Sequence, residues 1–292
     1  MKIHYLSTLL ILILSGCNSG QKLSDAYGNF EADPVIVSAE AAGKVLMFQP
    51  EEGQELEAGA IVGIIDTILP TLKKKQAIAQ IEAVKSKRKA VKAQVGVLEE
   101  QLKNLEVNEA RVEKMLKDGA ATQKQLDDIT GNIRVVEKQV SSTRTQFTSI
   151  NKEIEVLNAQ MEILDEQLEK CKIINPVKGT VLETFIEQGE ITPLGRALFK
   201  IAGLRELNLK VYVSGAMLPS VKIGQQVEVI VDKDGKNNQS LEGTVTWISP
   251  EAEFTPKIIQ TKEERVKLVY AVKVKVKNDG RLKIGMPGEV RF

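Results

Sequence analysis

The middle of the chain carries a long heptad repeat of apolar residues. From Leu126 to Cys171 the apolar positions follow one another in alternating steps of three and four residues, and only Thr143 is polar. This spacing places every member on one side of an α-helix and is typical of a coiled-coil seam. The seam comprises Leu126, Ile129, Ile133, Val136, Val140, Thr143, Phe147, Ile150, Ile154, Leu157, Met161, Leu164, Leu168 and Cys171.

A second heptad seam precedes the first. It is interrupted by Arg88 and Glu109, and a polar residue in a seam usually costs stability and fixes the register of the helices. Each helix is predicted to hold about 45 residues and so to span roughly 65–70 Å. The seam comprises Ala77, Ile81, Val84, Arg88, Val91, Val95, Leu98, Leu102, Leu105, Glu109, Val112 and Leu116.

A short break separates the two seams. Gly119 suits the left-handed position just after a helix, and Thr122 followed by Gln125 fits a capping box at the start of the next one. A break this short between matched helices predicts an antiparallel hairpin. The alternative is a parallel homodimeric coiled coil, which is disfavoured because an uninterrupted rod needs no stop and restart.

The segments on either side of the predicted hairpin repeat each other. Each copy has three glycines, spaced ten and then six residues apart, and then an apolar strand pattern. Such segments predict short strands joined by glycine turns. The two copies resemble the halves of a biotinyl- or lipoyl-type β-sandwich, with the hairpin in place of the tight turn between them. The glycines are Gly43, Gly53 and Gly59 before the hairpin, and Gly179, Gly189 and Gly195 after it.

The last third of the chain is rich in alternating strand patterns. Several short strands with glycine and proline between them predict a small β-barrel. Lys273, Lys275 and Lys277 alternate with valines, which predicts an ordinary solvated outer face on that strand. The alternating segments are 207–213, 227–231, 244–248 and 269–276.

The N-terminus predicts a lipoprotein. The apolar run from Leu6 to Leu14 is too short for a comfortable transmembrane helix and ends in Leu14-Ser15-Gly16-Cys17. These four residues resemble the bacterial lipobox, whose cysteine becomes the lipidated first residue. The alternative is an ordinary signal peptide with a chance cysteine. The polar residues after Cys17 lack the acidic run that resembles a surface-export signal, which favours a periplasm-facing anchor. Either membrane could hold this anchor, and the inner membrane is the preferred one. Cys171 then has no disulfide partner.

Charge and composition argue against several functional classes. The chain has 40 basic and 39 acidic residues, and one basic residue, Lys2, lies in the expected signal peptide. A chain without net charge has no general attraction for nucleic acid. The one histidine, His4, lies in the same segment, so the rest of the chain has no histidine-assisted nucleophile and no imidazole metal ligand. We therefore expect no enzyme activity, catalytic residue, metal site or cofactor.

The order of these parts resembles the HlyD-type periplasmic adaptor, or membrane fusion protein, family. Residues 243–250 and 285–288 are similar to the barrel of adaptors that serve ABC-type exporters. The resemblance implies an elongated α+β fold, in which a split lipoyl-like β-sandwich is interrupted by a helical coiled-coil hairpin and followed by a β-barrel. The expected parts are a lipoprotein signal peptide (1–16), a lipidated tether (17–34), a first lipoyl-like half (35–70), the hairpin (71–172), a second lipoyl-like half (173–204) and the barrel (205–292).

The resemblance also implies a function and a contact site. Such adaptors form homo-oligomers, usually hexamers, that join an inner-membrane transporter, ABC-type or proton-driven, to a TolC-like outer-membrane channel. In several members the hairpin tip carries Arg, then Leu four residues on, then Ser seven further. Arg111, Met115 and Thr122 stand at those spacings, and with Gly119 they form the expected channel-contacting tip. The alternative is that Arg111 is an ordinary solvated helix residue and does not contact the channel.

Two other functions compete with the adaptor. A structural coiled-coil envelope lipoprotein would need the hairpin but not the split sandwich. A biotinyl or lipoyl carrier would need a lysine in a tight turn between the two halves. Lys73 to Lys75 instead stand where the first helix is expected to begin, which disfavours the carrier.

Overall fold

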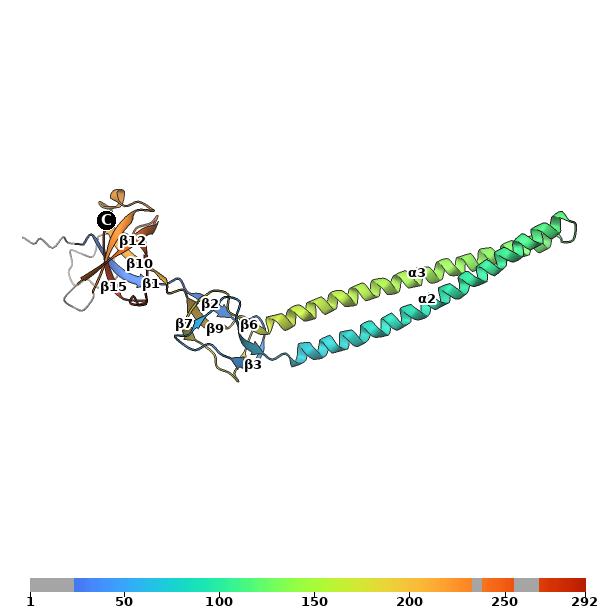
Figure 1. The fold of residues 1–292 in the computed structure, drawn as a ribbon, viewed down its shortest axis with the longest axis horizontal. Helices are drawn as coiled ribbons and strands as arrows, with labels where there is room; N and C mark the ends of the chain where they lie inside the picture. The colour runs from blue at the N-terminus through green and yellow to red at the C-terminus, as the bar shows by residue number, and fades with distance from the viewer. Residues whose placement is uncertain (1–23, 233–237, 255–267) are drawn as a thin grey trace, which may run out of the picture. The chain divides into compact units, whose positions relative to one another are not determined.

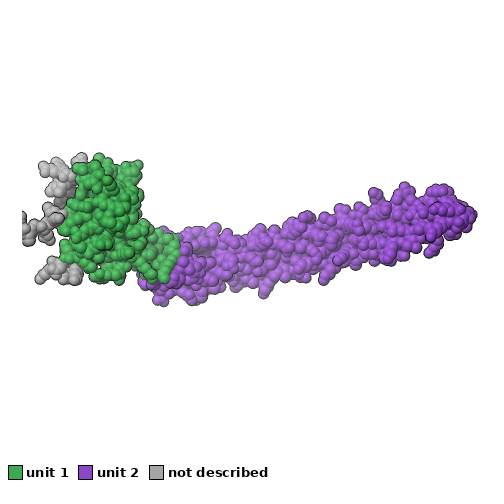
Figure 2. Space-filling model, turned by 45° about the horizontal axis from the view of Figure 1, so that its top comes forward, with its two compact units in different colours: residues 1–35, 177–182, 201–292 green, residues 36–176, 183–200 purple. Residues whose placement is uncertain are grey.

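The computed structural model describes residues 24–232, 238–254 and 268–292 of the chain. The predicted signal peptide and the predicted lipidation site Cys17 lie outside the described residues. The chain divides into two compact units (Figure 2). One unit holds Met1–Val35, Val177–Leu182 and Ile201–Phe292, and the other holds Ile36–Pro176 and Glu183–Lys200.

Two long helices form an antiparallel hairpin in the second unit (Figure 1). α2 spans Ile68–Lys117, 50 residues, and α3 spans Gln123–Lys170, 48 residues. At the usual helical rise each is roughly 70–75 Å long. The predicted seams are confirmed, because every fully buried residue of the two helices belongs to them. These residues are Ala77, Ile81, Leu98, Ile133, Val136, Val140, Ile150, Ile154 and Leu164.

The turn between the helices has the predicted caps. Gly119 adopts a φ of 66°, its N–H donates to the carbonyl of Leu116, and the N–H of Ala120 donates to the carbonyl of Met115 at 2.7 Å. This pair of bonds is a Schellman motif, which satisfies carbonyls at the end of α2. Thr122 and Gln125 form the capping box at the start of α3, so the chain reverses without leaving the helix ends unsatisfied.

Two four-stranded sheets combine strands from both glycine-spaced segments. The first has the order β2-β9-β7-β4 and the second β6-β5-β3-β8. The strands β2, β3, β4 and β5 of the first half correspond to β6, β7, β8 and β9 of the second, and exchanging each strand for its counterpart turns the first order into the second. The two halves are therefore related as in an internal repeat, and each sheet contains strands of both. The strands are β2 (Val35–Ser38), β3 (Gly43–Phe48), β4 (Glu55–Leu56), β5 (Ile61–Ile65), β6 (Lys172–Ile174), β7 (Gly179–Thr184), β8 (Ile191–Thr192) and β9 (Ala197–Ala202).

The hairpin leaves this sandwich from one sheet. β5 leads into α2, and α3 leads into β6, which pairs with β5 in antiparallel register. Beside this exit, the fully buried Asn175 donates its side-chain N–H to the carbonyl of Glu57 at 2.8 Å. The hairpin therefore connects the two halves, as predicted. The pairing of β5 with β6 holds the start of α2 close to the end of α3.

The remaining strands close a six-stranded barrel in the first unit. Its order is β10-β1-β15-β11-β12-β14, and β14 pairs back to β10 over the whole length from Glu206 to Ser214. β13 adds to the edge of β14. The strands are β1 (Ala26–Glu31), β10 (Glu206–Ser214), β11 (Gln226–Asp232), β12 (Asn238–Ile248), β13 (Glu253–Phe254), β14 (Leu268–Lys277) and β15 (Pro287–Arg291), with a 3-10 turn, η1, at Leu218–Ser220.

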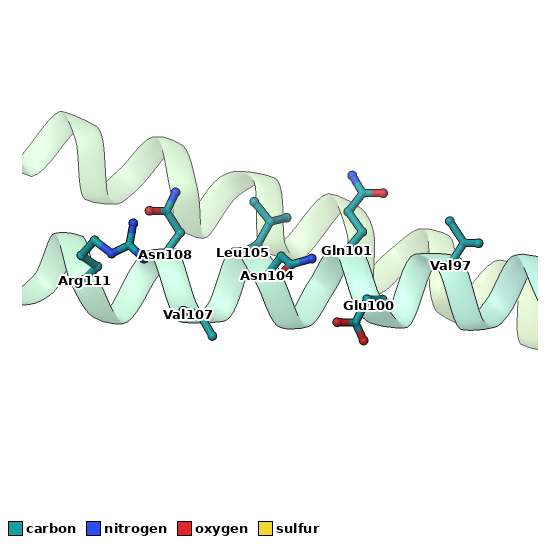
Figure 3. Close-up of a pocket in the computed structure, with 8 residues that line it drawn as sticks. All are labelled: Val97, Glu100, Gln101, Asn104, Leu105, Val107, Asn108 and Arg111. Carbon is teal, nitrogen blue, oxygen red and sulfur yellow. The ribbon is translucent and has the colours of Figure 1, made fainter.

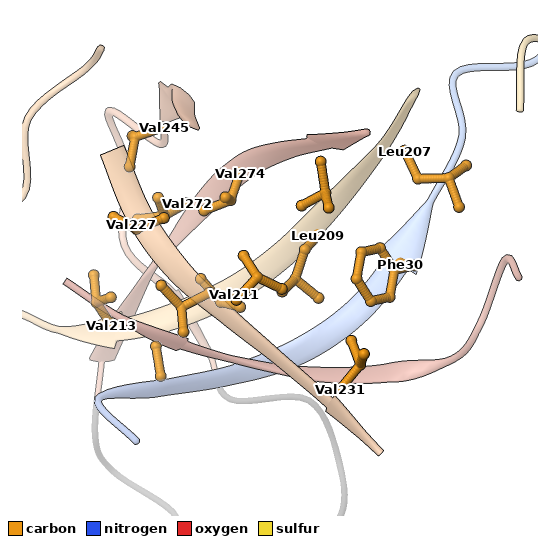
Figure 4. Close-up of a cluster of buried hydrophobic side chains, with 14 of the residues drawn as sticks. Phe30, Leu207, Leu209, Val211, Val213, Val227, Val231, Val245, Val272 and Val274 are labelled. Atoms are coloured by element: carbon orange, nitrogen blue, oxygen red, sulfur yellow. The ribbon is translucent and has the colours of Figure 1, made fainter. Parts of the chain in front are cut away.

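Alternating side chains of these strands fill the barrel interior (Figure 4). Phe30, Leu209 and Val274 are completely buried there. Gly288 of β15 faces this core, because a Cβ at that position would come within 3.0 Å of the Phe30 ring. The glycine of the predicted barrel motif thus makes room for the aromatic side chain.

β1 corrects one sequence-based expectation. Residues 17–34 were assigned to a lipidated tether, but Ala26–Glu31 is a barrel strand that pairs with β10 and β15. Ala26 and Phe30 point into the core. The alternation is obscured by Gly28 at the intervening inward position, where a Cβ would lie 1.7 Å from the Lys210 carbonyl oxygen. The strand is therefore specified by partners about 180 and 260 residues away in sequence.

Carboxylates accompany the lysines on the outer face of the barrel. The ammonium of Lys273 lies 3.6 Å from Asp33, and that of Lys275 lies 3.3 Å from Glu206. Exposed pairs of this kind contribute little stability. They agree with the predicted solvated face and give no sign of an anion-binding surface.

Candidate interaction surface of the helical hairpin

Polar contacts between α2 and α3 fix the register of the hairpin from its base to its tip. Each contact joins two residues that are nearly the same number of residues away from the turn, so the two seams face each other in register along the whole hairpin. The contacts are Lys74 with Asp165, Lys87 with Glu153 at 4.0 Å, Glu99 with Arg144 at 2.6 Å, and Glu109 with Thr130 at 2.6 Å.

Glu109 shows how a polar residue is accommodated in the seam. Its carboxylate accepts a hydrogen bond from the Thr130 hydroxyl of the facing helix. A buried polar group that is paired in this way avoids the cost of lost hydration. The contact lies near the tip and holds the two helices in one register there, as expected for a polar seam residue.

The four predicted tip residues lie at the end of α2 and in the turn. Arg111 and Met115 are one helical turn apart on α2 and are both exposed. Gly119 forms the turn itself. Thr122 is exposed, but its hydroxyl oxygen accepts from the Gln125 N–H at 3.3 Å and its O–H donates to the Gln125 side chain. Arg111 and Met115 are therefore the tip side chains available to a partner, while Gly119 and Thr122 shape the turn.

A shallow groove on α2 extends from Arg111 toward the middle of the hairpin (Figure 3). Sequence reasoning missed this surface because it followed only the seam. The available signal was the set of uncharged residues on one helix face between Glu100 and Arg111, which are Gln101, Asn104, Val107 and Asn108. The groove is lined by Val97, Glu100, Gln101, Asn104, Leu105, Val107, Asn108 and Arg111.

The described part of the chain offers no grouping of three or more His, Cys, Asp or Glu side chains suited to a metal ion. Within the same residues, neither long helix is apolar enough to cross a membrane. The surface features that stand out are the hairpin tip and the groove beside it.

Comparison with known sequences gives partial matches. No protein-family profile matches the chain. A UPF0194 membrane protein of Yersinia enterocolitica is 33% identical over 126 residues, which is 43% of this chain and 38% of that protein. A UPF0194 membrane protein of Yersinia pseudotuberculosis matches to the same extent. The match thus spans less than half the length of these relatives.

Solved structures match nearly the whole chain. MacA from Actinobacillus actinomycetemcomitans aligns with a TM-score of 0.60 at 19% identity, covering 92% of this chain and 78% of that one. The membrane fusion protein Spr0693 from Streptococcus pneumoniae R6 aligns with a TM-score of 0.52 at 15% identity, covering 91% and 97%. A MacA–MexA chimera with the Pseudomonas aeruginosa MexA α-hairpin aligns at 0.55 and 19% identity, covering 92% and 80%.

The fold is that of the membrane fusion proteins. The sequence-based resemblance to this group is confirmed at the level of the fold, with its hairpin, its antiparallel sheets and its closed barrel.

Proposed function

We propose that this chain is the periplasmic adaptor of a tripartite efflux or secretion system. It links an inner-membrane transporter, for which ABC-type is preferred over proton-driven, to a TolC-like outer-membrane channel. The observation that carries the proposal is the capped hairpin inserted between the two halves of the sandwich. A stiff helical pair roughly 70 Å long is suited to bridging a distance and presenting a small contact end.

The contact end in this proposal is the tip. Arg111 and Met115 offer a guanidinium and a flexible thioether side chain at the solvent-exposed end of α2. An arginine can bind carbonyl or carboxylate oxygens with paired donors, and methionine adapts to irregular apolar surfaces. Gly119 and Thr122 hold the turn that presents them.

The other end is proposed to be held at the membrane. Cys17 is the lipidated residue, and the lipid sits in the inner membrane with the protein in the periplasm. The curated relatives are named membrane proteins, which supports a membrane association. Several copies, six in the preferred arrangement, assemble around the path of the cargo, and the chain itself carries out no chemical reaction.

Crosslinking in cells tests the proposal. The lipidated full chain is crosslinked and purified from membranes, and co-purifying proteins are identified by mass spectrometry. Recovery of an inner-membrane transporter together with an outer-membrane channel is the expected result. If neither is recovered from cells in which the chain itself is crosslinked into oligomers, the adaptor proposal is wrong and an envelope scaffold is favoured.

A further inference from the structure

The outer wall of the barrel contains a hollow of about 350 Å³ where β10, β1, β15 and β11 pair with one another. Alternate residues of a strand point to the same face, so the side chains that line the hollow stand in two rows across these strands. One row holds Tyr212, Tyr27, Glu289 and Ile230, each paired with the next, and the second row holds Asn29, Pro287 and Asp232.

Two glycines form the floor between the rows. Gly28 and Gly288 are direct partners on β1 and β15. A Cβ at Gly288 would lie within 3.0 Å of Phe30 and Leu209 in the core, and one at Gly28 would collide with the Lys210 carbonyl oxygen. Neither position can carry a larger side chain, so backbone lines the hollow there. A site supported by paired strands in this way is held rigidly.

Two tyrosines stand side by side in the first row. Tyr27 is 54% exposed and Tyr212 is half-buried. The face of a tyrosine ring attracts cations, and the chain already uses this property, because the Lys210 ammonium lies 5.5 Å from the centroid of the Tyr212 ring. That ammonium is also held 3.5 Å from the carboxylate of Glu253. Tyr27 has no such cation within the described residues.

The hollow itself is acidic. Glu289 and Asp232 line it, and no lysine or arginine does. Glu289 accepts a hydrogen bond from the Ser24 hydroxyl, but neither carboxylate forms an ion pair with any residue that the structure describes. Ile230 faces outward and yet is only 4% exposed, so it and Pro287 provide an apolar surface beside the charges. Rings, carboxylates and aliphatic carbon thus meet in one concave place.

We propose that this hollow binds a small organic cation, namely a quaternary or protonated amine that carries an apolar group. Its volume lies at the lower end of the range for small-molecule sites, which combine apolar walls with a few polar groups. The tyrosine faces and the two carboxylates recognise the positive charge, and Ile230 and Pro287 contact the apolar group. Anions are disfavoured by the same carboxylates. The assignment does not rest on the adaptor function, because it concerns one copy of the chain alone.

Fluorine NMR of the full chain, labelled with fluorotyrosine and purified in nonionic detergent, tests the site with benzyltrimethylammonium. Of the four tyrosines, Tyr5 lies in the predicted signal peptide, which leaves three reporters in the rest of the chain. Tyr270 packs against the barrel core and does not line the hollow. We expect saturable shifts of the Tyr27 and Tyr212 signals and a constant Tyr270 signal. Benzyl alcohol, which keeps the ring without the charge, should shift none of them.

Two matched double variants separate the hollow from the general charge of the barrel. Asp232→Asn with Glu289→Gln removes both carboxylates of the hollow and leaves an acceptor for Ser24. The control, Glu242→Gln with Glu251→Gln, removes two exposed carboxylates outside it. The first variant should bind benzyltrimethylammonium at least about tenfold more weakly, because the cation loses both opposite charges, and the control should bind like the wild type. Circular dichroism should show the same folded spectrum for all three chains.

A third variant examines the ring. Tyr27→Leu keeps an apolar side chain and removes the π-face, so binding should weaken about threefold, read from the Tyr212 signal. The assignment is overturned if no tyrosine signal shifts, if Tyr270 shifts together with the others, or if benzyl alcohol produces the same shifts. It is also overturned if the Asp232/Glu289 variant binds like the wild type, or if the Glu242/Glu251 control loses as much affinity.

Discussion

Gly119 adopts a φ of 66° with no atom within 4 Å of the position that a Cβ would take. The turn therefore has room for a side chain at this position, and only the left-handed backbone conformation restricts which residues can replace Gly119. Left-handed geometry costs an ordinary L-residue about 1–2 kcal/mol, and a β-branched side chain resists it most. We predict that Gly119→Val lowers the free energy of unfolding by at least about 1 kcal/mol, measured by thermal denaturation followed by circular dichroism.

Gly119→Asn is the matched control for this prediction. Asparagine tolerates the left-handed region better than other non-glycine residues, so this variant should lose clearly less stability than Gly119→Val. Equal melting temperatures for the valine variant and the wild type would contradict the assigned cap.

Cys171 is the last residue of the α3 seam and is 2% exposed. Its thiol donates to the carbonyl of Gln167 at 3.3 Å, and burial, aided by the carboxylate of Asp66, raises its pKa. The thiolate is the reactive form, so the folded chain should keep this thiol inert at neutral pH. In a Cys17→Ser background, we predict slow reaction with a chromogenic disulfide reagent and fast reaction after unfolding in guanidinium. Fast labelling of the folded chain would contradict this packing role.

Between the two helices, the contact of Glu109 with Thr130 is the clearest polar contribution to the seam. Thr130→Val leaves the half-buried carboxylate without this donor, and we expect a loss of about 1 kcal/mol, the usual net value of one hydrogen bond. Glu109→Leu combined with Thr130→Val replaces both partners with apolar groups and should recover that stability or exceed it.

A double-mutant cycle measured by urea denaturation checks this expectation. Glu109→Leu, Thr130→Val and the double variant are compared with the wild type. If the two single effects simply add, the side chains do not interact and the seam contact has no energetic role.

The elements differ in how far their sequence could predict them. Heptad spacing and the Gly119 to Gln125 caps are local patterns, so the hairpin and its turn followed directly from them. β1 is different, because Phe30 joins a core built by strands from the other end of the chain. No local sequence pattern predicts that β1 pairs with strands so distant in the sequence. The uncharged groove residues Gln101, Asn104 and Asn108 were visible in the sequence, but the heptad pattern describes only the seam and does not show that they line one surface.

At the scale of the whole molecule, the proposed function needs a membrane anchor, proposed at Cys17, and a contact end, proposed at the tip of a hairpin roughly 70 Å long. Loss of the contact at the tip should be separable by mutation from loss of the proposed assembly of copies.

Arg111 allows that separation to be tested at the tip. It is exposed and makes no ion pair within the described residues, so Arg111→Asp should leave the unfolding free energy within about 0.5 kcal/mol of wild type. If this guanidinium binds the channel, reversing its charge should reduce co-purification of the channel about tenfold or more and abolish transport. The matched control is Arg134→Asp, an exposed arginine of α3, which should change neither.

Several copies of the chain are proposed to assemble, so the oligomer of the Arg111→Asp variant must be measured in the same preparation. Lost channel binding with an intact oligomer assigns Arg111 to the channel contact. Lost channel binding together with dissociation would instead assign it to lateral packing, because a tip that never assembles cannot engage a channel. Normal transport in this variant would leave Arg111 as a solvated helix residue and would move the channel contact to other residues of the turn.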